Sequence, residues 1–250
     1  KIQGEENTQT PQSEEKGSES SAPRAEASPP PAVLASRSDG VGIEGIPVNP
    51  EQIQAGIPHL RFAVELDESP MKGHVDADAP VTIVMFSDFE CPYCLQSHRV
   101  LQQLSAEYPD KIRLVYKAFP LGMHPSAMIA AMIAEAAEER GTFWTFHDLL
   151  FSGEELSFEN LIRYAETSKL DIQQLQTEIT DYKYASNVRR DMRLARRFDI
   201  NSTPVFFVNG RMIGGAMPIE AFREMVDEEI LLAEQWKKQG VKDIYAHATG

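Results

Sequence analysis

The amino-acid sequence predicts an α/β domain with the element order β-α-β, then a block of helices, then β-β-α. Three observations support this order. Residues 81–86 and 112–118 are two strand-like runs that flank an amphipathic helical pattern. From residue 125 onward the hydrophobic period stays helical, and strand signals return only at residues 204–213. We therefore expect one sheet that is interrupted in sequence by an all-helical insertion at about residues 121–200.

The first quarter of the chain differs in composition from the rest. Residues 1–61 contain no Phe, Tyr or Trp and hold half of the 16 prolines. Such a segment buries too little apolar surface to offset the cost of ordering its backbone, about 1–2 kcal/mol per residue. We expect residues 1–49 to form a disordered acidic tether rich in Pro and Ser, and residues 50–250 to form the folded domain.

The overall charge excludes two classes of function. The net charge of -14 argues against nucleic-acid binding and against polybasic docking to an anionic membrane, since both require clustered Lys and Arg.

A transmembrane helix needs about 18 or more consecutive apolar residues, and the given sequence has no such run. Because the sequence begins at Lys1 and not at Met, we expect a targeting segment outside it. The expected tether at residues 1–49 fits a domain held away from a membrane anchor that also lies outside the given sequence.

Three strands are expected before the insertion. Residues 61–66 alternate apolar and polar side chains and predict an edge strand, and residues 68–73 then predict a turn. Residues 81–86, Val-Thr-Ile-Val-Met-Phe, are almost all apolar and predict a central strand buried on both faces. Residues 112–118 alternate and predict a third strand, which Pro120 closes.

The helical patterns have recognisable starts and stops. Leu101, Leu104 and Tyr108 form one stripe of a helix that ends before Pro109. Ser157 and Asp171 are suitable N-caps. Within the insertion we expect helices at residues 125–140, 142–151, 157–167, 171–179 and 182–198, the first of them stopped by Gly141.

A hairpin and a last helix are expected to complete the sheet. Asn209-Gly210 lies between the strand-like runs 205–208 and 211–213, and a type I′ turn needs positive φ at both central residues. Pro218 is placed to open the last helix, and Gly240 is placed to end it. The hairpin therefore closes the sheet and the helix covers it.

Both cysteines of the chain, Cys91 and Cys94, lie at the junction between the central strand and the following helix. The free N–H groups and positive end of a helix favour a thiolate there, so Cys91 is expected at or just before the first turn and Cys94 one turn deeper. Two cysteines in this spacing do not build a disulfide scaffold. They indicate redox chemistry or metal binding.

Several ordered motifs resemble the DsbA-like branch of the thioredoxin fold, which carries a helical insertion at this point. The motifs are residues 86–94 (FSDFECPYC), 119–121 (FPL), 124–125 (HP) and 204–210 (PVFFVNG). The resemblance covers about residues 66–239. It implies a protein thiol-disulfide oxidoreductase, most simply one of oxidative folding, in an extracytoplasmic compartment such as the bacterial periplasm or cell envelope. It also implies a redox partner protein and protein substrates with thiols or disulfides.

By this resemblance Cys91 is the exposed nucleophile and Cys94 the resolving cysteine. No organic cofactor is implied, because the redox-active Cys91–Cys94 disulfide carries the electrons. Pro92 and Tyr93 are expected to tune the pair, and Tyr93 either contacts substrate or covers the disulfide.

The same resemblance places a cis-proline loop, Thr203-Pro204, opposite the cysteines, where its backbone can pair with an extended substrate. DsbA has valine before this proline, whereas threonine is similar to the reductase and isomerase relatives. A disulfide reductase or isomerase of the same fold is therefore the alternative to an oxidase.

Two alternatives lie outside redox catalysis. Cys91, Cys94 and His98 could supply three ligands of a zinc or copper site, although the sequence offers no second CxxC or His pair to complete it. The CxxC could also be a passive staple in a binding protein, but closing so short a loop contributes little entropy.

Four polar residues near the motifs remain outside the expected catalytic set. Asp88 and Glu90 would raise a thiol pKa if they lay close to the cysteines, but we expect solvated loop charges. His124 is expected either to approach the site or to cap the next helix. Lys117, near the end of a strand, is equally suited to a surface position.

Overall fold

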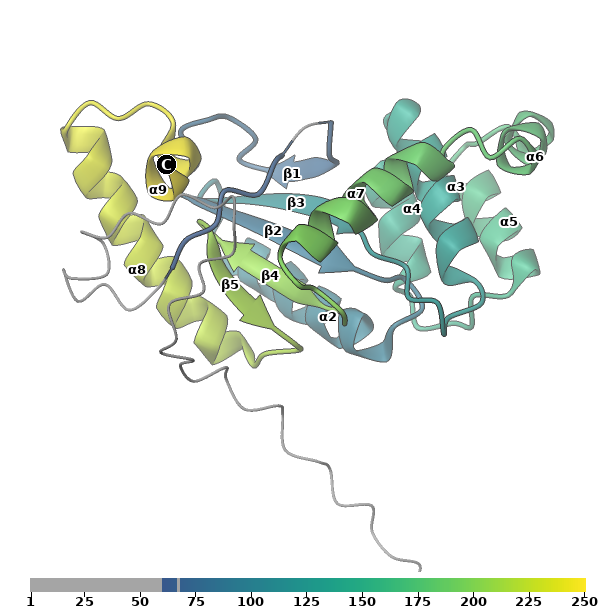
Figure 1. Ribbon diagram of the computed structural model, residues 1–250, viewed down its shortest axis with the longest axis horizontal. Coiled ribbons are helices and arrows are strands. Elements are labelled where there is room, and N and C mark those ends of the chain that lie inside the picture. Colours follow the sequence, from purple (N-terminus) through teal and green to yellow (C-terminus); the bar gives the residue numbers. More distant parts are fainter. Residues whose placement is uncertain (1–59, 67) are drawn as a thin grey trace, which may run out of the picture. The chain divides into compact units, whose positions relative to one another are not determined.

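A five-stranded mixed sheet with the order β1-β3-β2-β4-β5 forms the centre of the fold (Figure 1). The computed structural model describes residues 60–66 and 68–250, so the expected tether at residues 1–49 lies outside the described residues. The strands are β1 (Met71–Gly73), β2 (Val81–Ser87), β3 (Ile112–Ala118), β4 (Val205–Val208) and β5 (Arg211–Gly214). The predicted order β-α-β, helices, β-β-α is confirmed.

The central strand β2 pairs in parallel with β3 and antiparallel with β4. Every residue of β2 and of β3 is buried. The apolar, β-branched composition of β2 predicts this for a strand covered on both faces. The alternation of β3 does not, because Arg113 and Lys117 are buried as well. Because β2 and β3 are parallel, their carboxyl ends meet at the same edge of the sheet. The loop that carries the cysteines begins at this edge, directly after Ser87.

The prediction of a first strand at residues 61–66 was wrong. Only one isolated bridge forms there, between Arg61 and Arg211. The hydroxyl of Tyr245 accepts from Val64 N–H and donates to Val64 C=O, both at 3.0 Å, so this backbone is satisfied by a side chain and not by a neighbouring strand. Its alternation of apolar residues reflects packing of Phe62 and Val64 on the sheet.

The edge strand is instead β1, at the position where the sequence predicted a turn. It pairs antiparallel with β3 over three residue pairs, of which Met71 with Val115 is the first. Positive φ at Glu68 and Gly73 bends the chain on either side of this short strand. The sheet therefore has the expected number of strands with a different edge.

Helices cover both faces of the sheet (Figure 1). Helix α2 (Pro92–Glu107) and helix α8 (Ile219–Lys238) contribute Leu101, Leu104 and Phe222 to the core on one face. Helix α7 (Ala185–Arg197) contributes Leu194 to the core on the other face. A short helix, α9 (Ile244–Thr249), follows α8, so the helix that starts after Pro218 is not the last one.

The predicted helical insertion is confirmed. Figure 1 shows α3 to α6 gathered beyond the carboxyl ends of β2 and β3. The side chains of Ser157 and Asp171 accept from Asn160 N–H and Gln174 N–H, which confirms both N-caps. The helices are α3 (Ala127–Glu139), α4 (Phe143–Leu150), α5 (Phe158–Thr167), α6 (Ile172–Thr180) and α7.

The predicted type I′ hairpin between β4 and β5 is confirmed. Asn209 and Gly210 have φ values of 43° and 86°. The Asn209 side chain is buried and accepts from Thr82 N–H at 2.8 Å, which ties the turn to β2. Within the described part of the chain, none of the helices is both long and apolar enough to cross a membrane.

Candidate functional site

Cys91 is the N-cap of α2, and Pro92 follows at the first helical position. Proline fits there because the missing N–H would have had no partner within the helix. Cys91 N–H donates to Asp88 C=O at 3.2 Å, which fixes the loop between β2 and the helix. Both cysteines are free thiols in this structure. The predicted placement of the pair at a strand-to-helix junction is confirmed.

The two cysteines hardly differ in exposure. Cys91 is 5% exposed and Cys94 is 2% exposed, so the expected contrast between an exposed and a protected sulfur is small. Between them, Tyr93 is 61% exposed. A ring with so much of its surface in solvent is not packed as a cover over the cysteines. The remaining sequence expectation for Tyr93 is contact with a substrate.

Electrostatics distinguishes the cysteines strongly. A hydrogen bond from the Cys94 thiol lowers the pKa of Cys91 to about 5, despite an opposing effect of burial. The Thr203 side chain and the backbone N–H groups of Cys94 and Tyr93 contribute to the same lowered value. These N–H groups belong to the first turn of α2, where a helix has donors without intrahelical acceptors.

Burial has the opposite effect on Cys94. It raises the pKa of the Cys94 thiol, and the hydrogen bond to Cys91 and the charge of Cys91 raise it further. Asp88 N–H lies 3.4 Å from Cys94 Sγ and acts against this shift only in part. The pair therefore holds one negative charge, on Cys91, and one proton, on Cys94.

The fold brings the Thr203-Pro204 loop to the cysteines across 112 positions of sequence. Cys91 Sγ lies 3.6 Å from the carbonyl oxygen of Thr203. The Thr203–Pro204 peptide bond is cis, and β4 begins immediately after Pro204. Because β4 is paired with β2, the start of one strand lies beside the end of the other, which is where the cysteine loop begins.

Asp88 is not a solvated loop charge, so that expectation was wrong. The residue is 1% exposed. Its carboxylate accepts hydrogen bonds from Glu90 N–H at 2.8 Å, from Leu121 N–H at 2.8 Å and from His124 Nδ1 at 2.7 Å. Burial is tolerated because every one of these groups donates to the charged form.

Residues 88–91, between β2 and α2, form the cysteine loop, and the loop at residues 119–126 is joined to it at a second point. The Glu90 carboxylate accepts from Ser126 N–H at 2.7 Å, next to the start of α3. Of the two expectations for His124, the structure shows the approach to the site, through Asp88. The sequence signal was the pair of motifs at residues 88–90 and 124–125, which gave no indication of their mutual contact.

Lys117 is buried and not on the surface. It is 1% exposed, and its Nζ lies 3.5 Å from Asp191 Oδ1. Asp191 Oδ2 accepts from Ala118 N–H at 3.0 Å. Asp191 belongs to α7, so this ion pair lies on the face of the sheet that α7 covers. No pattern near Asp191 in the sequence predicts that this carboxylate is buried.

The alternative metal site is not assembled. Among the described residues, two groups bring three ligand atoms within 4.8 Å of one another, and neither includes a cysteine. His98 belongs to one of them, with His147 and Asp148. There Lys72 Nζ lies 3.6 Å from Asp148 Oδ1, and a lysine ammonium at that oxygen opposes cation binding.

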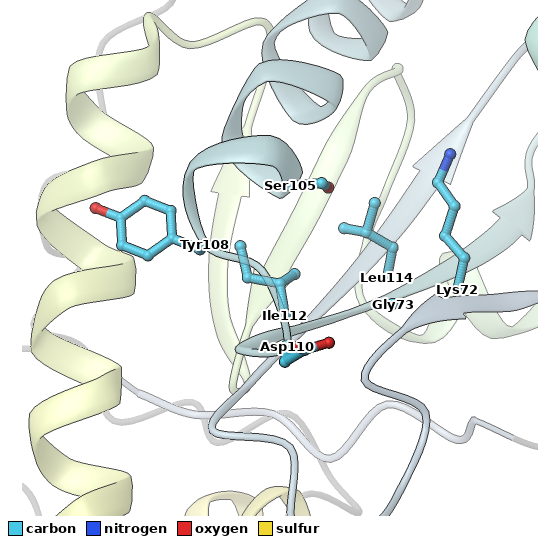
Figure 2. A pocket seen from close by; sticks show the side chains of 7 residues that line it. All are labelled: Lys72, Gly73, Ser105, Tyr108, Asp110, Ile112 and Leu114. Carbon is cyan, nitrogen blue, oxygen red and sulfur yellow. The ribbon is translucent and has the colours of Figure 1, made fainter.

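A cavity of about 110 Å³ lies at the opposite end of α2 from the cysteines, where Ser105 and Tyr108 meet the start of β3 (Figure 2). Figure 2 shows Tyr108 projecting toward α8, where its hydroxyl donates to Asp227 at 2.8 Å. Ligand pockets for small molecules usually measure roughly 300 Å³ or more. The cavity is therefore not the functional site.

A family model described as Thioredoxin (Thioredoxin_4) matches residues 68–228, which is more than half of the chain. The chain belongs to this thioredoxin family. A curated relative, the Na(+)/H(+) antiporter NhaA 3 of Salinispora tropica, is 39% identical over 173 residues, which cover 68% of this chain and 26% of that protein. The chain thus spans about a quarter of the length of the curated relatives that it matches.

Solved structures agree with the family. A thioredoxin-like oxidoreductase from Silicibacter pomeroyi matches with 28% identity and a TM-score of 0.59, over 65% of this chain and 92% of that one. A periplasmic thioredoxin-like protein from Salmonella enterica serovar Typhimurium matches with 25% identity and a TM-score of 0.55, over 66% and 91%.

The fold is also similar to that of the thiol-disulfide exchange protein alpha-DsbA2 from Wolbachia pipientis. This structure matches with 22% identity and a TM-score of 0.57, over 64% of this chain and 86% of that one. This thioredoxin family member carries Cys91 and Cys94 as a CxxC pair.

Proposed function

We propose that the domain exchanges disulfides with protein substrates through Cys91-Pro92-Tyr93-Cys94, in the direction of oxidative folding. The observation that carries the proposal is the opposite perturbation of two thiols three residues apart: the pKa of Cys91 is lowered to about 5, and the pKa of Cys94 is raised. A nucleophile that is ionised at neutral pH beside a protonated partner is the arrangement that disulfide exchange requires.

The oxidative reaction begins with the Cys91–Cys94 disulfide. A substrate thiolate attacks Cys91 Sγ, and the S–S bond breaks toward Cys94, which takes a proton as it leaves because burial disfavours its thiolate. A second substrate thiolate then attacks the substrate sulfur of the mixed disulfide and releases Cys91 as a stable thiolate. Two substrate thiols lose two electrons, and the CxxC pair gains them.

The stabilised Cys91 thiolate supports the oxidative direction. A low pKa favours the reduced form of the pair and so makes its disulfide more oxidising. Thr203 supports the alternative of a reductase or isomerase, because threonine before this proline is the residue of those relatives in the resemblance. The reduction potential discriminates: about -120 mV is typical of DsbA, and about -270 mV is typical of thioredoxin.

The surroundings of the cysteines suit a protein substrate. Tyr93 is 61% exposed, and Met123, next to His124, is 76% exposed. Exposed apolar side chains beside a reactive group offer contacts to unfolded chains. The backbone at Thr203-Pro204 is placed to pair with an extended substrate segment. A redox partner protein that reoxidises the pair completes the proposed cycle.

We also propose that the domain works outside the cytoplasm, in the periplasm or cell envelope, held at a membrane by a segment outside the given sequence. One of the matched structures is that of a periplasmic thioredoxin-like protein. The curated relatives are named as antiporters, and each is roughly four times the length of the part that matches. Protein disulfides persist in such oxidising compartments.

Single cysteine substitutions test the assignment. Cys91→Ala is expected to abolish oxidation of a reduced, unfolded ribonuclease while the far-UV circular dichroism of the domain stays unchanged. Cys94→Ala, mixed with ribonuclease that retains its disulfides, is expected to accumulate a mixed disulfide, because the Cys91 thiolate breaks a substrate disulfide and no second thiol of the domain remains to resolve it. Thr177→Ala, in an exposed turn of α6, serves as the control that retains activity. Turnover by Cys91→Ala would overturn the role of Cys91, and stoichiometric zinc with protected thiols would favour the metal alternative.

A further inference from the structure

The Asp88 carboxylate is a buried junction between the cysteine loop and the loop at residues 119–126. Its side chain has no exposed surface. Two of its partners, Glu90 N–H and Leu121 N–H, are backbone donors that do not change with pH. The third partner is His124 Nδ1 at 2.7 Å, and an imidazole changes charge near neutral pH. The junction therefore contains one group whose charge can vary.

His124 is placed to respond to charge at the cysteines through its partner Asp88, whose C=O accepts from Cys91 N–H at 3.2 Å and whose N–H lies 3.4 Å from Cys94 Sγ. Its side chain is 19% exposed, so protons can reach it. Burial lowers the pKa of His124, but the hydrogen bond to Asp88 and the charges of Asp88, Cys91 and Glu90 raise it, and the net result is a raised pKa. These three groups lie in the segment that ends at Cys91, the N-cap of α2.

Of these groups, only Cys91 changes its charge with the redox state. In the reduced pair it is a thiolate, whereas in the disulfide it is neutral. Coupling between two sites is reciprocal, so a thiolate that favours protonation of His124 is itself favoured by the protonated imidazole. The hydrogen bond between His124 Nδ1 and the Asp88 carboxylate holds the ring in position.

We propose that His124, held by Asp88, is a positioning residue that takes up a proton when the Cys91–Cys94 disulfide is reduced, so that at low pH the disulfide is a stronger oxidant than it would be without this imidazole. This inference rests on the proposed function. With glutathione as reductant, two glutathione thiols lose two electrons and two protons and leave as glutathione disulfide. Cys91 becomes a thiolate and Cys94 takes one proton. His124 takes the other at pH values between its pKa in the disulfide form and its higher pKa in the reduced form, and outside this range the second proton goes to solvent.

Histidine titration in both redox states tests the proposal in the unmodified chain. His74 is an internal control, because its Nε2 also pairs with a carboxylate, Asp78, at 2.8 Å and lies at the other end of the sheet from the cysteines. We expect NMR titration to give a higher pKa for His124 in the reduced protein than in the disulfide form, and the same pKa for His74 in both. Equal His124 values in the two forms would overturn the proposal.

A second measurement uses His124→Gln, whose amide retains a donor toward Asp88 and has no charge, with His74→Gln as the control. We expect the equilibrium constant for reduction by glutathione at pH 5.5 to be roughly three- to tenfold lower for His124→Gln than for the wild type, as expected for a partly solvated charge pair. The difference should vanish at pH 9, and His74→Gln should follow the wild type throughout.

The proposed disulfide exchange and the proposed role of His124 are refuted by different results. If the wild-type cysteines form no disulfide that glutathione reduces, the proposed function is wrong. If they cycle, but His124→Gln follows the wild type at every pH, the proposed function stands and the role of His124 is wrong. Parallel curves that differ equally at pH 5.5 and pH 9 would show a structural effect of the substitution and would also overturn the proton uptake.

Discussion

Lys117 Nζ and Asp191 Oδ1 lie 3.5 Å apart, and both residues are almost completely buried, at 1% and 3% exposure. The pair joins the end of β3 to α7 at the base of the loop that leads to residues 119–126. Burial raises the pKa of Asp191, and the charge of Lys117 opposes that shift. Removal of the two charges from water costs free energy, and the attraction between them offsets this cost.

Removal of one partner of this pair should destabilise the domain strongly. Lys117→Met leaves the buried carboxylate with the more distant Arg190 Nε, 3.8 Å from Asp191 Oδ1, as its remaining cation, and we expect a loss of about 3 kcal/mol at pH 7. Without Lys117 the Asp191 pKa rises further, so the folded state binds a proton that the unfolded state releases. The free energy of unfolding of Lys117→Met then falls as the pH rises above the pKa that Asp191 has in the unfolded chain. The stability that the variant loses relative to the wild type should therefore be smaller at pH 4 than at pH 7. Urea unfolding at both pH values measures it.

The double variant Lys117→Met/Asp191→Asn provides the control for charge. The asparagine oxygen can still accept from Ala118 N–H, so the backbone contact of Asp191 is retained. We expect the double variant to recover much of the lost stability at pH 7. A double variant that is as unstable as Lys117→Met would show that packing of the lysine stem, and not charge, is responsible.

The reactivity of Cys91 should follow its lowered pKa. Because its pKa is about 5, the rate of alkylation of the reduced protein by iodoacetamide should rise with a midpoint near pH 5 and be constant above about pH 7. Cys94→Ala removes the hydrogen bond that contributes most to this shift and should move the midpoint upward. A wild-type midpoint at pH 8 or above, the range of a free thiol, would contradict the assignment.

The elements that the sequence predicted well are those with long hydrophobic patterns or explicit caps. Strands β2 and β3, the insertion helices and the hairpin at Asn209-Gly210 all carry such signals. Strand β1 has three residues and helix α9 has six, which is too short for a hydrophobic period to identify them. Residues 61–66 alternate as a strand does, but beyond the single bridge at Arg61 they pack on the sheet without forming a strand.

The cysteine pair was predictable because all its signals are local. The buried charges were not, because the partner that makes burial tolerable lies far away in sequence. Asp88 and His124 are 36 positions apart. Lys117 depends on a carboxylate that another helix supplies. A sequence pattern shows that a residue is charged, but only the fold shows whether an opposite charge meets it.

Thr203 should tune the Cys91 thiolate. Its side chain is among the groups that lower the pKa of Cys91. Thr203→Val has nearly the same shape and lacks the hydroxyl, so we expect a higher Cys91 pKa and a less oxidising disulfide. Iodoacetamide alkylation against pH and equilibration with glutathione measure the two effects. Thr177→Val, on the exposed surface of α6, is the matched control, and an unchanged Cys91 midpoint in Thr203→Val would contradict the tuning role.

Glu229 should be the residue of α8 on which stability depends most strongly. Its side chain has no exposed surface and binds Arg61 through both oxygens, at 2.7 Å and 2.9 Å. It also accepts from Asn209 Nδ2 at 3.1 Å and lies 3.3 Å from Arg211 Nη1. Glu229→Ala leaves a buried arginine without this carboxylate, and we expect a loss of about 3–5 kcal/mol in urea unfolding.

The exposed ion pair between Arg197 and Glu65 is the matched control for Glu229. Its partners lie 2.7 Å apart but are 64% and 55% exposed. Arg197→Ala should therefore cost about 1 kcal/mol or less, and that cost should shrink in high salt. The cost of Glu229→Ala should persist in high salt, because the buried charges are poorly screened. Equal costs for the two variants would show that burial does not determine the strength of the Glu229 network.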